Sequence, residues 1–148
     1  MTEKLGKTLQ LLLVLAAIFG SNYFVPIKTI IEPPYAYLGL LLILAGVWLD
    51  IWAASFFKKA ETSFKLRGKT TSLVTDGPFG FSRNPIYLGI LAVLLGIAVF
   101  FGSLIAFLYP ALFFILFHFV VIPMEEKWME VNFGEVYLEY KRMVRRWL

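Results

Sequence analysis

Two short polar motifs carry the side chains with the clearest chemical potential in this sequence. Arg83 and Asn84 open a long apolar run, and Glu125 and Glu126 follow directly after its end. A guanidinium and an amide can bind a carboxylate and an amino group, whereas carboxylates accept charge-assisted hydrogen bonds from hydroxyl or ammonium groups. Neighbouring residues on a helix point about 100° apart, so we expect the two glutamates to have different partners.

The run that separates the motifs, residues 84–124, contains no formally charged side chain. A bilayer core about 30 Å thick is crossed by roughly 20 helical residues. The run is therefore long enough to cross a membrane, turn at Phe101-Gly102-Ser103 and return. Because such a hairpin ends on the side where it began, we expect both motifs to lie at one face and to form one site.

The composition also indicates a membrane protein. Of the residues, 59% are hydrophobic and 16% are charged, against about 25% charged residues in an average soluble domain. The sequence predicts an all-α integral membrane protein with one domain over residues 1–148 and both termini on the same side. Four transmembrane helices are expected, at residues 9–27, 35–57, 86–101 and 104–122.

Two polar segments complete the predicted architecture. Residues 58–85 form a loop, expected to be irregular after an Asp76-Gly77 turn, that would cover a cofactor. Residues 124–147 form a C-terminal helical segment, interrupted at Phe133-Gly134, that would lie on the membrane surface. Its amphipathic face is predicted from apolar residues at spacings of three, four and three, namely Tyr137, Tyr140, Val144 and Trp147.

The basic residues predict the orientation. All but one of the 14 lysines and arginines fall on one side of the predicted spans, the exception being Lys28. By the positive-inside rule both termini are cytoplasmic, and the small size suggests a prokaryotic inner membrane. The alternative for the first span is a cleaved signal peptide, because Lys4 and Lys7 precede it and small residues follow near Gly20-Ser21.

Several classes of chemistry are excluded by residue usage. The chain has no Cys, and His118 is its single His, which excludes disulfides, thiolate catalysis and Cys/His metal sites. The basic residues flank hydrophobic spans, so anionic lipid explains them better than nucleic acid does. We therefore expect a site without metal and a membrane-lipid environment.

The two motifs, taken with their surroundings, resemble a known family. Residues 77–89, GPFGFSRNPIYLG, resemble the signature Gly-Pro-Tyr-x-Tyr-x-Arg-(His/Asn)-Pro-x-Tyr-x-Gly of the isoprenylcysteine carboxyl methyltransferase and phospholipid methyltransferase superfamily. Residues 125–140 resemble its C-terminal signature, in which a glutamate pair precedes Phe-Gly and two tyrosines. The resemblance covers roughly residues 38–148. Phe79 and Phe81 replace the usual tyrosines, Gly80 replaces a commonly basic position, and Asn84 stands where many members have His.

The resemblance implies methyl transfer from S-adenosylmethionine. This reaction is an in-line displacement that chiefly requires orientation of donor and acceptor and exclusion of water. The expected cofactor-binding residues are Arg83, Asn84, Pro85, Tyr87, Gly89, Glu125 and Glu126. For Glu125 and Glu126 the alternative is stabilisation of a helix N-terminus, for Arg83 a contact with lipid headgroups, and for Gly89 helix packing.

The acceptor is expected to be lipophilic and to enter from the membrane. The catalytic candidates are Glu126 together with Arg142 or Arg145, because an arginine can hold an acceptor carboxylate or phosphate in a bidentate contact; Arg146 is a less favoured candidate. A carboxylate acceptor needs no general base, and the resemblance implies a prenylated-cysteine carboxylate as the best-known acceptor type, so carboxyl O-methylation of an isoprenylcysteine-like substrate is favoured. N-methylation of a lipid amine is the alternative within methyl transfer.

Two other functional classes remain as alternatives. NADPH-dependent membrane sterol or enone reductases carry a related Arg-His-Pro-x-Tyr-x-Gly-Glu signature, but here Asn84 and Ile90 replace its His and Glu. A noncatalytic membrane scaffold is the third class. Separately, Asp50 and His118 are ionisable groups inside predicted spans at similar depth, so we expect them to face the bundle interior, where they can pair. The alternative is that each makes separate contacts with water or backbone.

Overall fold

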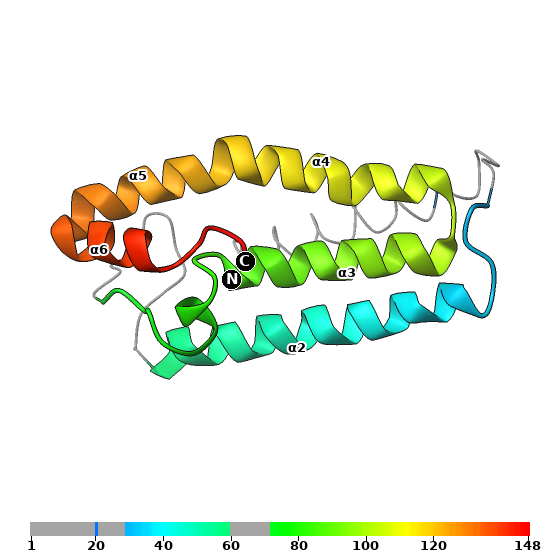
Figure 1. Cartoon of the computed structure of the whole chain (residues 1–148), viewed down its shortest axis with the longest axis horizontal. Coiled ribbons are helices and arrows are strands. Elements are labelled where there is room, and N and C mark those ends of the chain that lie inside the picture. Colours follow the sequence, from blue (N-terminus) through cyan, green and yellow to red (C-terminus); the bar gives the residue numbers. More distant parts are fainter. Residues whose placement is uncertain (1–19, 21–28, 60–71) are drawn as a thin grey trace, which may run out of the picture.

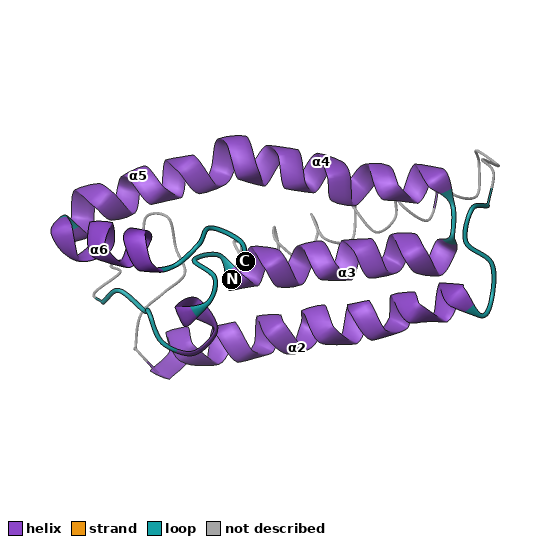
Figure 2. Cartoon of the chain, viewed as in Figure 1, coloured by secondary structure: helices purple, strands orange, loops and turns teal. Residues whose placement is uncertain are grey.

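The computed structural model describes residues 20, 29–59 and 72–148 of the chain. Within these ranges the structure is helical, without a named strand, and an isolated bridge joins Thr29 to Ser103 (Figure 2). The long helical segments lie side by side, and a short helix folds back at one end (Figure 1). The all-helical class is therefore confirmed, whereas the first predicted span, residues 9–27, apart from Gly20, and Lys28 lie outside the described residues.

The first described rod begins with the 3-10 turn η1, Tyr35–Tyr37, and continues as α2, Leu38–Lys59, close to the predicted range of 35–57. Its side chains are divided between two faces. Gly39, Gly46 and the fully buried Ala53 recur every seven residues on the face towards α3. Large apolar side chains are exposed elsewhere on α2, including Leu41, Leu44, Trp48 and Ile51.

Glycines allow α2 to pack directly against α3, Pro85–Phe101. A Cβ atom on Gly96 would lie 2.6 Å from the Gly39 carbonyl oxygen, and one on Gly46 would lie 2.5 Å from the Gly89 oxygen. The two backbones thus touch at two places, one heptad apart. Small residues at such contacts are typical of helix pairs in membranes, where close backbone packing drives association.

A tight turn at Gly102 reverses the chain after α3, as predicted from Phe101-Gly102-Ser103. Gly102 adopts a left-handed conformation with φ of 65°, and its N–H caps α3 by donating to the carbonyls of Ala98 and Val99. Its own carbonyl accepts hydrogen bonds from the N–H groups of Ile30 (2.7 Å) and Ile31 (3.3 Å). These hydrogen bonds fix the turn from both sides. The residue is a glycine because glycine alone adopts this conformation without a Cβ penalty.

The returning rod is longer than the sequence predicted. It comprises η3, Leu104–Phe107, then α4, Leu108–Leu116, a π-helical turn, Phe117–Val121, and α5, Ile122–Phe133. The span was expected to end at residue 122, before Pro123. A proline ring normally clashes with the carbonyl four residues earlier. Here that carbonyl lies within the wider π turn, which lets the helix continue through Pro123.

The C-terminal segment contains a shorter helix than predicted. Gly134, with φ of 55°, ends α5 and interrupts the helical segment as expected, and α6 covers Glu135–Met143. Val144 is extended, so the amphipathic helix does not reach residue 147. The reason is tertiary: the carbonyls of Arg145 and Arg146 accept hydrogen bonds from Arg83 and Asn84, just before α3, and the C-terminus lies there (Figure 1).

Two helical segments of the described chain are long and apolar enough to cross a membrane, Tyr35–Phe56 and Leu104–Phe133. The α3 segment, Pro85–Phe101, is also apolar but shorter. The exposed faces of α2 and α4 carry many large apolar side chains, such as Leu44 (66% exposed) and Leu112 (54% exposed). A bilayer would cover these faces. The four-span arrangement and the side of the termini stay predictions.

Candidate functional site

Arg83 and Glu126 meet where the two arms of the hairpin end. Arg83 lies two residues before α3, and Glu126 lies in the second turn of α5. The Arg83 Nη1 atom is 3.1 Å from Glu126 Oε1, and the two side chains are 9% and 7% exposed. The expectation that the hairpin brings the two motifs together is confirmed.

Two further cations converge on the same carboxylate. Arg146 donates from Nε to Glu126 Oε1 (3.0 Å) and from Nη2 to Oε2 (2.9 Å), a bidentate pair. Lys141 Nζ lies 3.3 Å from Glu126 Oε2 and 2.7 Å from Glu130 Oε1. Both oxygens of Glu126 are therefore engaged by protein groups.

The three neighbouring cations determine the charge state of Glu126. This residue lies after the apolar part of the returning rod. Burial alone would raise the pKa of the carboxyl, but the Arg146 hydrogen bond and the charges of Arg83, Arg146 and Lys141 outweigh it and hold the pKa below its ordinary value. The hydrogen bond to Glu130 is the main reason that the pKa of Lys141 is raised. Glu126 is thus an anion, and Lys141 a cation, at neutral pH.

The Arg83 guanidinium has hydrogen-bonding capacity to spare. Its Nε and Nη1 atoms are buried and donate no hydrogen bond to any described residue, although Nη1 is ion paired with Glu126. A buried donor without an acceptor is costly, by about 1–3 kcal/mol. Nε, a buried donor of this cation without an acceptor among the described residues, is the feature expected of a site that receives an anionic ligand.

Glu125 has a separate partner, as the helical spacing predicted. Its Oε1 accepts a 2.6 Å hydrogen bond from the Tyr87 hydroxyl, one turn into α3. The Tyr87 ring packs edge-on against Phe117 of the π turn, at 4.6 Å between ring centroids. The second glutamate is therefore also tied to the start of α3, but through a neutral phenol instead of an arginine.

Asn84 and its neighbours hold the C-terminal tail, residues 144–148. Asn84 Nδ2 donates to the Arg146 carbonyl (2.9 Å), and the Arg83 backbone N–H donates to the Arg145 carbonyl (2.9 Å). The Ser82 hydroxyl donates to the Arg146 carbonyl (3.4 Å) and accepts from the Asn84 N–H (3.2 Å). Pro85, the first residue of α3, is fully buried beneath them.

Gly89 lies on the face of α3 that packs against α2, away from the charged cluster formed by Arg83, Glu126, Lys141 and Arg146. A Cβ at this position would collide with Asp50 Oδ1 and would lie 2.8 Å from the Gly46 carbonyl oxygen. The geometry fits the helix-packing alternative raised by the sequence. A cofactor contact at Gly89 stays a prediction.

The arginines favoured by the sequence for catalysis, Arg142 and Arg145, have exposed side chains. The arginine that reaches the cluster is Arg146, the candidate that the sequence ranked lower. Arg146 lies beyond the end of α6 at Met143, on the tail that returns to the start of α3. The roles predicted for Arg142 and Arg145 stay predictions.

The pairing of Asp50 with His118 is wrong. Asp50 Oδ1 is buried against Gly89 without a hydrogen-bond partner among the described residues. His118 Nδ1 instead accepts a 3.0 Å hydrogen bond from Trp147 Nε1, and the imidazole stacks on Phe114. The partner of His118 is therefore the tail, and Asp50 and His118 have separate surroundings.

Tyr140 fastens the first motif to α6. Its hydroxyl donates a 2.7 Å hydrogen bond to the Phe79 carbonyl in η2, Gly77–Gly80, and both residues are buried. Tyr137, one turn earlier, is buried beside Arg83 and Glu126; burial is the main reason that its pKa is raised. The two tyrosines shared with the family signature therefore act in anchoring the loop and lining the cluster.

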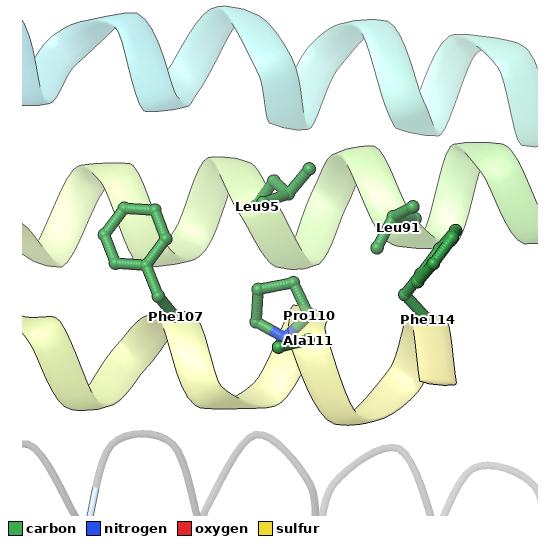
Figure 3. Close-up of a pocket in the computed structure, with 6 residues that line it drawn as sticks. All are labelled: Leu91, Leu95, Phe107, Pro110, Ala111 and Phe114. Carbon is green, nitrogen blue, oxygen red and sulfur yellow. The ribbon is translucent and has the colours of Figure 1, made fainter. Parts of the chain in front are cut away.

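An apolar groove runs between α3 and α4 (Figure 3). It has a volume of about 430 Å³ and is lined by Leu91, Leu95, Phe107, Pro110, Ala111 and Phe114. Phe114 also stacks on His118 and packs against Trp147, each at 5.3 Å between centroids. The Phe114 end of the groove is therefore next to the tail that holds Glu126.

Comparisons with known proteins agree with the sequence motifs. The family described as "Phospholipid methyltransferase" matches residues 34–136. An "Uncharacterized protein" of Haemophilus influenzae (strain ATCC 51907 / DSM 11121 / KW20 / Rd) is 36% identical over 63 residues, which are 43% of this chain and 100% of that protein. No solved structure matches. The family match spans both arms of the hairpin and both motifs, and the chain therefore belongs to the phospholipid methyltransferase family of membrane methyltransferases that act on lipids.

Proposed function

We propose that this protein transfers a methyl group from S-adenosylmethionine to a lipophilic acceptor held in the membrane. The observation that carries the proposal is the buried guanidinium of Arg83, which is ion paired with Glu126 and whose Nε atom has no acceptor among the described residues. S-adenosylmethionine has a carboxylate to accept a hydrogen bond from it. When bound, it would supply an electrophilic methyl group on a sulfonium.

The residues around Arg83 fit the other polar groups of such a donor. The Asn84 amide nitrogen is committed to the Arg146 carbonyl, so its oxygen is left to accept a hydrogen bond from an ammonium group. Glu126 has both oxygens engaged, so its role in this proposal is to fix Arg83. Glu125, held by one hydrogen bond from Tyr87, is the carboxylate offered to the ribose hydroxyls.

The groove between α3 and α4 supports a lipophilic acceptor. A single hydrocarbon chain could lie along Leu91 and Leu95 and place its head near Trp147, at the polar end. The exposed Arg142 and Arg145 are proposed to attract an anionic head. These features favour a carboxylate acceptor of the isoprenylcysteine type, which needs no general base.

A phospholipid amine is the second candidate acceptor, favoured by the family that matches the chain. Such an amine must lose a proton before it attacks the methyl group, whereas a carboxylate need not. Products of the two reactions differ, one being a methyl ester and the other a methylamine. The proposed location is a prokaryotic inner membrane with both termini cytoplasmic, from the distribution of basic residues.

Titration calorimetry on the protein in lipid nanodiscs tests the proposal. We expect S-adenosylmethionine to bind and NADPH not to bind. Binding of NADPH alone would support a membrane reductase, and binding of neither would support a noncatalytic scaffold; each result would overturn the proposal.

A further inference from the structure

We propose that Arg146 is a positioning residue of the donor site, which holds Glu126 and Asn84 in the relative placement that donor binding requires. The inference rests on the proposed function and deepens it. Arg146 belongs to neither of the sequence signatures, and it lies on an extended tail instead of a helix.

The side chain of Arg146 makes a contact that no other basic residue type can reproduce. Its guanidinium donates two parallel hydrogen bonds to the oxygens of Glu126, at 3.0 and 2.9 Å. Nη1 donates a third, longer bond of 3.4 Å to the His118 carbonyl in the π turn. A planar fork with this geometry fixes both the position and the rotation of a carboxylate, whereas a lysine ammonium acts as a point charge.

The main-chain carbonyl of Arg146 binds side chains of the first motif and of the residue before it. Its carbonyl accepts from the Asn84 amide at 2.9 Å and from the Ser82 hydroxyl at 3.4 Å. With its nitrogen committed in this way, the Asn84 amide presents its oxygen elsewhere. One residue therefore connects the carboxylate of α5 with the amide that precedes α3.

The role of the guanidinium can be separated from docking of the tail. The tail has anchors that do not depend on the Arg146 side chain, namely the Arg145 carbonyl on the Arg83 N–H (2.9 Å) and the Trp147 indole on His118 (3.0 Å). A shortened side chain at residue 146 should therefore release Glu126 while the tail stays bound. The carboxylate would still face Arg83 and Lys141, but without a fixed rotation.

The test compares donor affinity among variants in nanodiscs, with S-adenosylmethionine as the probe. Arg146→Ala should weaken binding about tenfold to a hundredfold, the range expected for one lost charge-assisted contact. Arg146→Lys should recover part of the loss. The matched control is Lys127→Ala, which removes the same charge from the exposed side of α5, next to Glu126, and should bind as the wild type does.

Two readouts distinguish positioning from a general loss of structure. Methylguanidine added to Arg146→Ala should restore donor affinity, and Arg146→Ala should cause no further loss of affinity in a protein that already carries Glu126→Gln. If Arg146→Ala does not fold, a folded Arg146→Lys variant with reduced affinity supports the inference, and one with wild-type affinity overturns it.

The outcomes also separate this inference from the proposed function. A wild-type protein that binds the donor, with a folded Arg146→Ala variant of equal affinity, overturns the role of Arg146 alone. Loss of affinity without rescue by methylguanidine overturns positioning in favour of a structural role. A wild-type protein that binds no S-adenosylmethionine overturns the proposed function itself.

Discussion

Arg83 and Glu126 form a nearly buried ion pair of 3.1 Å across the two arms of the hairpin. An apolar run long enough to cross a bilayer and return separates them in the sequence. The pair therefore depends on the hairpin, and the hairpin in turn is held closed at its polar end by the pair. This relationship is the basis of the predictions below.

Replacing Glu126 by Gln should weaken donor binding by at least about tenfold, since a charge-assisted hydrogen bond is worth roughly 1.5–3 kcal/mol. The physical reason is that Arg83, Lys141 and Arg146 would lose their shared anion. The measurement is the dissociation constant of S-adenosylmethionine by calorimetry.

The matched control for this variant is Glu139→Gln, an exposed position on α6. It should bind the donor as the wild type does. Equal affinity of the Glu126→Gln and wild-type proteins would remove Glu126 from the site.

The same carboxylate should make stability depend on pH in the acid range. The pKa of Glu126 is held below its ordinary value of 4.5, against the effect of burial, by Arg146, Arg83 and Lys141. A lowered folded-state pKa contributes stability that is fully present above the ordinary pKa and is lost as the pH falls through the folded value. The difference in melting temperature between wild type and Glu126→Gln should be constant above about pH 5 and shrink below about pH 4.

The melting temperature of the wild type has to be compared with that of Glu126→Gln, because the pKa of Glu125 is shifted in the opposite direction to that of Glu126. Burial raises the pKa of the Glu125 carboxyl, although the Tyr87 hydrogen bond partly offsets it. This contribution is common to both proteins and cancels in their difference. A difference that stays unchanged down to about pH 2 would contradict the proposed stabilisation of the Glu126 anion.

Replacing Gly96 by Val should separate α2 from α3. The new Cβ would lie 2.6 Å from the Gly39 carbonyl oxygen, a backbone atom that cannot move aside alone. Overpacking of this kind costs about 1–3 kcal/mol, which thermal unfolding in detergent would show as a lower melting temperature.

Gly80→Val is the control for this prediction, because the nearest atom to its Cβ, the Thr75 oxygen, is at an ordinary contact distance of 3.7 Å. An equal melting temperature for the Gly96→Val and Gly80→Val proteins would show that the glycine contact is not needed.

Filling the groove between α3 and α4 should impair a lipophilic acceptor selectively. Ala111→Trp places a large ring among Leu91, Leu95 and Phe114. We expect the KM for a long-chain acceptor to rise about tenfold, as for the loss of a few buried methylene groups, while the affinity for the donor is unchanged.

Leu112→Trp, at the next position on α4, is the control, since Leu112 is 54% exposed and does not line the groove. Equal acceptor kinetics for the two tryptophan variants would exclude the groove as the acceptor site.

Local sequence signals sufficed where the structure depends on local rules. The uncharged run predicted the hairpin, Phe101-Gly102-Ser103 predicted its turn, and the return of the hairpin predicted that Arg83 and Glu126 lie at one face. Each prediction rests on helix length or on a residue with special backbone freedom, which tertiary contacts do not override.

The tail could not be predicted in this way. Its attachment uses the backbone carbonyls of Arg145 and Arg146, and these leave no periodic pattern in the sequence. For the same reason α6 was expected to continue to Trp147, and His118 was paired with Asp50. Passage of the helix through Pro123 likewise depends on a π turn that has no sequence signature here.

The most direct test of the central claim is transfer of a labelled methyl group from S-adenosylmethionine to a membrane-lipid extract by the purified protein in nanodiscs. We expect label in a lipid-soluble product, identified as an ester or an amine by its stability to alkali, and at least about tenfold less label with Glu126→Gln. Label that stays in the donor with the wild-type protein, or equal transfer by both proteins, would contradict methyl transfer at the site that joins Arg83 and Glu126.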